Sequence, residues 1–451
     1  MTDAATNPAP LEPGTRALVL GLGRTGLSVA RYLARKGLEV RVADTRAEPP
    51  AAGALREAVP AAELRTGAFG SGLLEGMAQV VISPGLALGQ PIVREALARG
   101  LPVTGDFELF AREAQAPVAA ITGTNGKSTV TTLVAGLANA AGRRALAGGN
   151  LGEPALDLLE QPVPELYVLE LSSFQLETTC SLQTRTATVL NVTPDHLDRY
   201  ADLAGYAAAK ARIFDGCEVA VVNADDAAVR AMPREGQAVV TFSLVAQDAD
   251  YALGGAGEPV ILCRGEPLLP LRALRLQGLH NAANAMAALA MAEALELPRG
   301  PALEALAAFP GLPHRSQWVA DLDGVRYVDD SKGTNVGATL AAVAGMTGPL
   351  VLIAGGDGKG QDFAELRAAF AGKVRHVVLI GRDAAALEAT LAGTCPTERA
   401  TDMRAAVEAA RAAARPGDTV LLSPACASLD MFRDYVHRGE VFADAVRSLS
   451  S

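Results

Sequence analysis

The stretch "TGTNGKST" at residues 122–129 carries the strongest chemical signal in the sequence. It follows an apolar run typical of a buried strand and precedes a helical pattern, which is the context of a phosphate-binding loop. In such a loop the lysine, here Lys127, contacts the β- and γ-phosphates of a nucleotide, and a hydroxyl, here Ser128 or Thr129, binds Mg²⁺. The loop is shorter than the full pattern, because Ile121 stands where its first glycine would be.

A second glycine loop, "GLGRTG" at residues 21–26, matches the G-x-G-x-x-G spacing between a predicted strand and a predicted helix. Its glycines allow backbone N–H groups to approach a diphosphate. Asp44 follows Gly26 by 18 residues, close to where an acid that binds a ribose is expected. The motif indicates a diphosphate rather than a nicotinamide. NAD(P), another nucleotide such as a UDP-sugar, and tight packing alone all remain open as interpretations.

Other polar residues in the middle of the chain follow predicted strands. Glu170 ends the apolar run "YVLE", where a carboxylate for Mg²⁺ is expected. His196 in "NVTPDHLDRY" could bind a metal or substrate, although a histidine in an acidic loop is more often only solvated. Asn281 and Asn284 share a helical face and could contact an adenine edge or form polar surface. By pattern alone, Lys210 in "GYAAAKARIF" is an exposed helix lysine.

The last part of the chain places cations and hydroxyls after apolar runs. Arg315 in "PHRSQ" is a candidate clamp on a transferring γ-phosphate. The motifs "DDSKGTN" and "GGDGKG" set Lys332, Thr334 and Lys359 at predicted strand ends, with Asp330 beside them. Two lysines and hydroxyls in a separate domain are typical of a pocket that binds a carboxylate.

The elements that must position these residues alternate between strands and helices. This alternation predicts right-handed βαβ units and parallel sheets, whose ligands gather beyond the carboxyl ends of the strands. The pattern starts afresh near residue 116 and again after a proline-rich linker, with four apolar strand runs in each part. We therefore expect an α/β protein with three domains, at residues 1–105, 106–310 and 311–451.

Composition restricts the class of protein further. A net charge of −10 argues against a nucleic acid or an anionic membrane as partner, whereas helix N-termini and a few local cations can still bind phosphates. The five cysteines are scattered without a C-x-x-C pair, which favours a reduced cytosolic protein over a disulfide or zinc site. No signal peptide is expected, and the uncharged run at 334–356 is predicted to form a helix, a turn and a strand rather than a membrane span.

Several motifs occur together and in order: residues 122–129, 170–177, 191–200 and 280–284, with "PHR", "DDSKGTN", "GGDGKG" and "LLSPACASLDMF". In this combination the sequence resembles the Mur ligase family over essentially the whole chain. The first domain, with "GLGRTGLS", "ADTR" and "SPG", resembles the members that join D-glutamate to UDP-N-acetylmuramoyl-L-alanine. The DNPR-type motif of the diaminopimelate- and lysine-adding members is absent.

The resemblance implies three domains with separate tasks. It implies a Rossmann-like N-terminal domain for the UDP-sugar, a central P-loop-type α/β domain for ATP and Mg²⁺, and a Rossmann-like C-terminal domain for D-glutamate. The implied contacts of the UDP-sugar are Gly21, Leu22, Gly23, Arg24, Thr25, Asp44, Thr45, Arg46, Ser83, Pro84, Gly85 and Asn150. Those of ATP are Gly123, Thr124, Asn125, Gly126, Lys127, Ser128, Thr129, Asn281, Asn284, Arg315, Asp330 and Lys332. Those of D-glutamate are Thr334, Lys359, Ser428 and Tyr435.

The implied reaction forms an amide through an acyl-phosphate intermediate in peptidoglycan precursor synthesis. The implied catalytic residues are Lys127, Glu170, His196, Lys210 and Arg315. Two Mg²⁺ ions are expected on Ser128, Glu170, His196 and a Lys210 that CO₂ has carbamylated. The resemblance implies a cytoplasmic monomer that acts on small molecules, and we expect its last domain to close over the central one about a hinge near 308–314.

Three alternatives remain open from the sequence. An NAD(P)-dependent oxidoreductase would use the first glycine loop but would leave the second without a purpose. A nucleotide-gated binding protein would hydrolyse ATP without an acceptor amine. Another Mur-type ligase, or a folylpolyglutamate-type ligase, would share the ATP motifs, although the latter does not need the "GLGRTG" domain.

Overall fold

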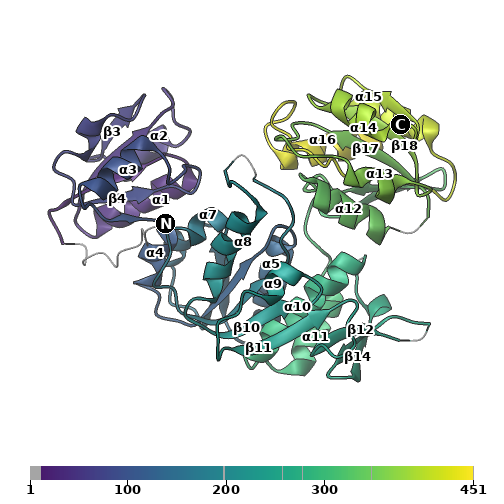
Figure 1. Ribbon diagram of the computed structural model, residues 1–451, viewed down its shortest axis with the longest axis horizontal. Helices are drawn as coiled ribbons and strands as arrows, with labels where there is room; N and C mark the ends of the chain where they lie inside the picture. The colour runs from purple at the N-terminus through teal and green to yellow at the C-terminus, as the bar shows by residue number, and fades with distance from the viewer. Residues whose placement is uncertain (1–11, 197–198, 256, 277, 347, 450–451) are drawn as a thin grey trace.

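Three β-sheets, each built from its own stretch of sequence, organise the protein. The computed structural model describes residues 12–196, 199–255, 257–276, 278–346 and 348–449. Figure 1 shows the three stretches as separate lobes, coloured purple, teal and green to yellow. The expected α/β fold with three domains is confirmed.

The first sheet has the order β3-β2-β1-β4-β5, and all of its pairings are parallel. This order is that of one half of a dinucleotide-binding fold, with its switch point between β1 and β4. The strands are β1 (Arg16–Leu20), β2 (Glu39–Asp44), β3 (Glu63–Thr66), β4 (Gln79–Ile82) and β5 (Val103–Thr104). The helices are α1 (Arg24–Arg35), α2 (Ala52–Ala58), η1 (Ser71–Leu74) and α3 (Pro91–Ala98), and α4 (Asp106–Ala111) leads into the central domain.

The central sheet has the order β14-β13-β12-β11-β10-β9-β6-β8-β7. Its pairings are parallel from β7 to β12, and β12, β13 and β14 pair antiparallel. The strands are β6 (Val118–Thr122), β7 (Ala145–Gly149), β8 (Leu166–Glu170), β9 (Thr184–Val189), β10 (Cys217–Asn223), β11 (Ala238–Ser243), β12 (Tyr251–Gly254), β13 (Val260–Cys263) and β14 (Glu266–Pro270). The helices are α5 (Lys127–Ala140), α6 (Ala155–Leu158), α7 (Ser173–Leu176), α8 (Leu203–Ala211), η2 (Arg212–Phe214), α9 (Ala227–Arg230), η3 (Leu271–Ala273), α10 (Leu279–Ala294) and α11 (Arg299–Ala308).

The third sheet has the order β15-β16-β20-β17-β18-β19, in which only the pair β15–β16 is antiparallel among the described residues. The strands are β15 (Gln317–Leu322), β16 (Val325–Asp329), β17 (Leu350–Gly355), β18 (Val374–Ile380), β19 (Thr397–Arg399) and β20 (Thr419–Leu422). The helices are α12 (Val336–Gly345), α13 (Glu365–Phe370), α14 (Ala384–Leu391), α15 (Met403–Ala413) and α16 (Tyr435–Ser448).

The loop after β1 in the first sheet and the loop after β6 in the central sheet both have backbone conformations that favour glycine. Gly21, directly after β1, has φ +90°, and Gly126, which caps α5, has φ +85°, in the left-handed region that other residues rarely adopt. Glu170, the last residue of β8, lies opposite Ile121 of β6 in the parallel register. The register therefore places the carboxylate beside the loop that follows β6.

The uncharged run at 334–356 forms helix α12 and strand β17, as predicted, apart from residue 347, which lies outside the described residues. Among the helices that the structure describes, none combines the length and the apolar character that a bilayer crossing requires.

The packing of α1 against the first glycine turn gives a stability prediction. A Cβ at Gly26 would collide with the carbonyl oxygen of Gly21 and lie 3.2 Å from Ser83 Oγ. Gly26→Ala should therefore lower the free energy of unfolding by about 1–3 kcal/mol, because α1 must shift from the turn. The control is Gly23→Ala, where an added Cβ has no neighbour within 4 Å. Urea unfolding curves measure both variants, and equal losses in the two would contradict the prediction.

Candidate active site

A cavity of 490 Å³, here called the glycine-loop cavity, lies between the first domain and the central domain. All residues that the sequence assigned to the UDP-sugar line it, except Leu22, whose side chain is buried beneath the turn. The central domain contributes Gly149, Asn150, Gly152 and Gln175. The structure thus brings the first glycine loop and Asn150 together across a domain boundary.

Asp44 is held in place at the edge of this cavity. Its carboxylate accepts a hydrogen bond of 2.7 Å from the backbone N–H of Leu22, so it fixes the glycine turn. It also pairs with the guanidinium of Arg46 at 2.6 Å. Hydrogen bonds from Arg46 and the backbone hold the pKa of Asp44 low, at about 2, despite its burial. Asp44 is therefore an anion at neutral pH.

A second cavity of 390 Å³, here called the central cavity, adjoins the first and shares Pro84, Gly85 and Asn150 with it. Residues from all three domains line it. They include Thr124, Asn125, Gly126, Lys127, Ser128, Glu170, Ser172, Ser173, Phe174, Asp195, His196, Tyr206, Lys210, Arg315, Lys332, Thr334, Asn335 and Lys359. The five residues that were expected to be catalytic therefore share one cavity.

Two lysines in the central cavity bind the same carbonyl oxygen. Lys127 Nζ donates to the carbonyl of Gly123 at 2.9 Å, and Lys210 Nζ donates to it at 2.8 Å. Burial lowers the pKa of Lys127, and it lowers the pKa of Lys210 far more, with Lys127 as a further cause. Two buried ammonium groups this close disfavour each other's charged form.

The pattern-based interpretation of Lys210 as an exposed helix lysine is wrong. Its side chain is among the most completely buried in the described chain. The interpretation failed because α8 is rich in alanine and gives little sequence signal for the face that turns inward. One sequence signal was available: Tyr206 precedes Lys210 by four residues, so the two side chains lie on the same face of the helix. In the structure Lys210 Nζ lies 4.5 Å from the centre of the Tyr206 ring.

Glu170 offers an oxygen that the protein leaves free. Its Oε1 accepts a hydrogen bond of 2.6 Å from Asn150 Nδ2, while its buried Oε2 has no hydrogen-bond partner among the described residues. The hydroxyl of Ser128 lies in the same cavity, where it accepts a 2.8 Å hydrogen bond from Arg315. A carboxylate and a hydroxyl are ligands that suit Mg²⁺, which usually takes one or two carboxylates and completes its shell with water and substrate phosphates.

The described residues hold no cluster of three or more histidine, cysteine, aspartate or glutamate side chains suited to a metal.

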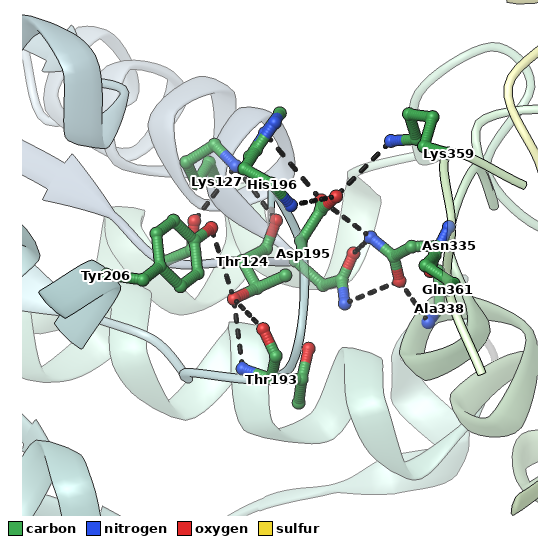
Figure 2. A network of polar contacts seen from close by, with 12 residues as sticks. Thr124, Lys127, Thr193, Asp195, His196, Tyr206, Asn335, Ala338, Lys359 and Gln361 are labelled. Atoms are coloured by element: carbon green, nitrogen blue, oxygen red, sulfur yellow. Dashed lines mark hydrogen bonds and ion pairs between the residues drawn. The ribbon is translucent and has the colours of Figure 1, made fainter. Parts of the chain in front are cut away.

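Asp195 joins the central domain to the last domain, as Figure 2 shows. Its Oδ1 lies 3.2 Å from Lys359 Nζ, and its Oδ2 accepts a 3.2 Å hydrogen bond from Asn335 Nδ2. Asn335 in turn caps α12 and contacts Asn125 of the phosphate loop at 3.4 Å. The Asp195 carboxylate thus bonds to two segments of the last domain, at residues 335 and 359, that are far from it in the sequence.

His196 follows Asp195 with a left-handed backbone, at φ +57°. Its ring lies edge-on to Phe174 with the ring centres 4.9 Å apart. Burial lowers the pKa of His196, although the neighbouring Asp195 carboxylate acts in the opposite sense. The imidazole is therefore held in its neutral form, which can accept a proton.

A third cavity of 280 Å³, here called the asparagine cavity, lies on the other side of the phosphate loop. Asn281 and Asn284 both line it, and a 3.2 Å hydrogen bond joins their side chains, so they do share one helical face. Asp330 and Lys332 line it too, and burial raises the pKa of Asp330 to about 7 and lowers that of Lys332 to about 8. Of the residues expected to contact ATP, Gly123 lines none of the three cavities in the described chain, although its carbonyl oxygen binds both lysines.

The residues expected to bind D-glutamate fall into two groups. Thr334 and Lys359 line the central cavity, whereas Ser428 and Tyr435 line none of the three cavities in the described chain. Tyr435 is nevertheless close, because Lys332 Nζ lies 4.0 Å from the centre of its ring. The sequence also missed Asp195 and Asn335, although each is the immediate neighbour of a predicted site residue.

The chain matches three family descriptions in succession. These are "Mur ligase MurD-like, N-terminal domain" over residues 15–105, "Mur ligase middle domain" over 121–292 and "Mur ligase, glutamate ligase domain" over 314–426.

Two similar proteins span almost the whole chain. The UDP-N-acetylmuramoylalanine–D-glutamate ligase of Nitrosococcus oceani is 52% identical over 98% of this chain and 99% of that protein. The ligase of the same name from Methylobacillus flagellatus is 54% identical over 96% of this chain and 97% of that protein.

Solved structures with little sequence similarity share the fold. The UDP-N-acetylmuramate-alanine ligase of Thermotoga maritima superposes with a TM-score of 0.61 at 19% identity, covering 96% of this chain and 99% of that one. A pseudomurein peptide ligase of type C from Methanothermus fervidus has a TM-score of 0.62 at 15% identity, covering 97% and 100%. The three family matches and the identity of about 50% to full-length relatives show that the chain belongs to the Mur ligase family.

Proposed function

We propose that this protein is an ATP-dependent ligase that joins D-glutamate to UDP-N-acetylmuramoyl-L-alanine in peptidoglycan precursor synthesis. The observation that carries the proposal is that the central cavity adjoins both of the other cavities and shares lining residues with each of them. The central cavity shares Pro84, Gly85 and Asn150 with the glycine-loop cavity, and shares Asn125 and Gly126 with the asparagine cavity. A nucleotide-sugar and ATP bound in the outer cavities can therefore direct their reactive ends into the same space.

The first step transfers the γ-phosphoryl group of ATP to the alanyl carboxylate of the acceptor and releases ADP. Lys127 and Arg315 supply the positive charge that stabilises the transferring phosphoryl group, since both line the central cavity. Ser128, Glu170, His196 and a carbamylated Lys210 would hold Mg²⁺. When bound, the metal neutralises phosphate charge and orients its oxygens.

The second step forms the amide. The amine of D-glutamate attacks the acyl-phosphate carbon, and inorganic phosphate leaves from the tetrahedral intermediate. The amine must lose a proton, and the neutral imidazole of His196 in the central cavity can accept it when its one acceptor nitrogen does not hold Mg²⁺. Lys359 and Thr334 bind a carboxylate of D-glutamate from the last domain. Closure of that domain, which remains a prediction, would exclude the water that hydrolyses an acyl-phosphate.

Lys210 is suited to carbamylation by its surroundings. CO₂ reacts with a neutral amine, and burial together with the charge of Lys127 favours that form of Lys210. Carbamylation replaces a cation with a carboxylate, so it would also reduce the excess of positive charge beside Lys127.

Substrate omission tests the proposed reaction. We expect phosphate release only when ATP, UDP-N-acetylmuramoyl-L-alanine and D-glutamate are all present, with L-glutamate inactive in place of D-glutamate. A coupled phosphate assay measures this, and mass spectrometry identifies the amide product. Lys127→Ala is the control for contaminating phosphatases and should lower the rate by about 10²–10³-fold, as loss of a preorganised charge contact does. Equal phosphate release without D-glutamate would point instead to a nucleotide-gated binding protein.

Carbamylation is tested by ¹³C NMR of the protein in ¹³C-labelled bicarbonate. We expect a carbamate resonance that grows as the pH rises, because a larger fraction of Lys210 then loses its proton. Lys210→Met should abolish the resonance. Lys127→Met should weaken it at a given pH, because removing the neighbouring cation raises the pKa of Lys210. A resonance that persists in Lys210→Met would assign the carbamate to another amine.

A further inference from the structure

Arg199 connects the central domain to the first domain at the edge of the central cavity. It lies just beyond His196 in sequence, and its side chain is only 14% exposed. Its guanidinium donates to two backbone carbonyls of the first domain, that of Pro84 at 3.1 Å and that of Leu86 at 2.6 Å. Neither the sequence motifs nor the reaction described above assigns a task to this residue.

The two carbonyls belong to one tight turn, residues 83–86, here called the 83–86 turn. It is closed by a hydrogen bond from the Leu86 N–H to the Ser83 carbonyl, 3.0 Å long. Ser83 Oγ donates to the carbonyl of Gly21 at 3.1 Å, which ties the turn to the first glycine loop. Pro84 and Gly85 line both the glycine-loop cavity and the central cavity. The turn therefore stands where an acceptor passes from one cavity into the other.

The other contacts of Arg199 fix it to the central domain. Its guanidinium lies 4.1 Å from the centre of the Phe174 ring, in a cation–π arrangement. Its NH2 group lies 3.8 Å from the carboxylate of Glu177. Its backbone N–H donates to the carbonyl of His196 at 2.9 Å. One residue thus links the 83–86 turn to the histidine of the central cavity.

We infer that Arg199 is a positioning residue that holds the 83–86 turn at the distance from His196 which the acceptor requires. The inference rests on the proposed function and adds a determinant of acceptor binding to it. Arginine suits the task because its rigid fork can donate to two carbonyls at once while its face stacks on an aromatic ring. A lysine has one ammonium group on a flexible stem and cannot reproduce that geometry.

A second link between the same two domains offers a matched control. Arg31 on α1 pairs with Glu160 at 2.7 Å and lies 3.8 Å from Asp157. Neither Arg31 nor Glu160 lines any of the three cavities in the described chain. Arg31→Ala therefore removes an arginine contact between the domains without touching the 83–86 turn.

The experiment compares steady-state kinetics of the wild type, Arg199→Ala, Arg199→Lys and Arg31→Ala in the full-length protein. We expect Arg199→Ala to raise KM for UDP-N-acetylmuramoyl-L-alanine roughly tenfold or more, since hydrogen bonds from a charged donor are lost. KM for ATP should stay within about twofold, because neither Pro84 nor Gly85 lines the asparagine cavity in the described chain. Arg199→Lys should fall between the wild type and Arg199→Ala, and Arg31→Ala should match the wild type.

Two further readouts separate positioning from loss of structure. Thermal unfolding identifies any variant that is less folded than the wild type. If Arg199→Ala is such a variant, the KM values of Arg199→Lys are compared with those of the wild type instead. Millimolar guanidinium should lower KM for the acceptor in Arg199→Ala but not in Arg31→Ala, because the small cation can occupy the vacated space over Phe174.

The outcomes distinguish the inference from the function on which it rests. A wild-type protein that does not turn over ATP with the acceptor and D-glutamate contradicts the proposed function. A wild type that turns over, with an unchanged acceptor KM in Arg199→Ala, overturns the inference alone. An equal rise in KM for all three substrates, or the same rise in Arg31→Ala, would reduce Arg199 to a general domain contact and would also overturn it.

Discussion

Buried positive charge is the constraint on which the site depends. Among the described residues, five basic side chains line the central cavity against two carboxylates: Lys127, Lys210, Arg315, Lys332 and Lys359 against Glu170 and Asp195. Burial lowers the pKa of Lys127, Lys210 and Arg315, which measures how unfavourable their charges are without an anion. Such an excess is costly to fold and is typical of a site that a polyanion completes. Phosphates and a substrate carboxylate would supply the missing negative charge.

The same feature of all three sheets places the basic side chains close together. In each domain the functional loops follow parallel strands at their carboxyl ends, where ligands of such sheets collect. The phosphate loop follows β6, Glu170 ends β8, and Lys332 follows β16. Because the three domains meet at these ends, side chains from loops far apart in sequence share one cavity. Asp195 bonds the central domain to the last domain, and Arg199 bonds it to the first domain.

The sequence predicted strands that are continuous apolar runs better than strands that are partly exposed. The apolar runs that predicted strands in the middle of the chain became β6, β8, β9 and β10, which are neighbours in the central sheet, and those in the last part became β16, β17, β18 and β20, which are neighbours in the third. Central strands are buried on both faces and read as continuous apolar runs, whereas β3, β15 and β19 are partly exposed and lack that signal. The phosphate loop and Glu170 were likewise recognisable locally. Asp195 and Asn335 were missed because their partners lie in another domain, and that information exists only after folding.

Asp195 and Arg199, four positions apart in sequence, bond to different domains. An inserted residue would lengthen the chain between them by up to about 3.5 Å, more than the tolerance of a hydrogen bond. One of the two attachments would then be lost whichever way the extra residue was accommodated. The four-residue separation of Asp195 and Arg199 thus sets the spacing between the contacts to the two outer lobes, so the chain between them should tolerate no change in length.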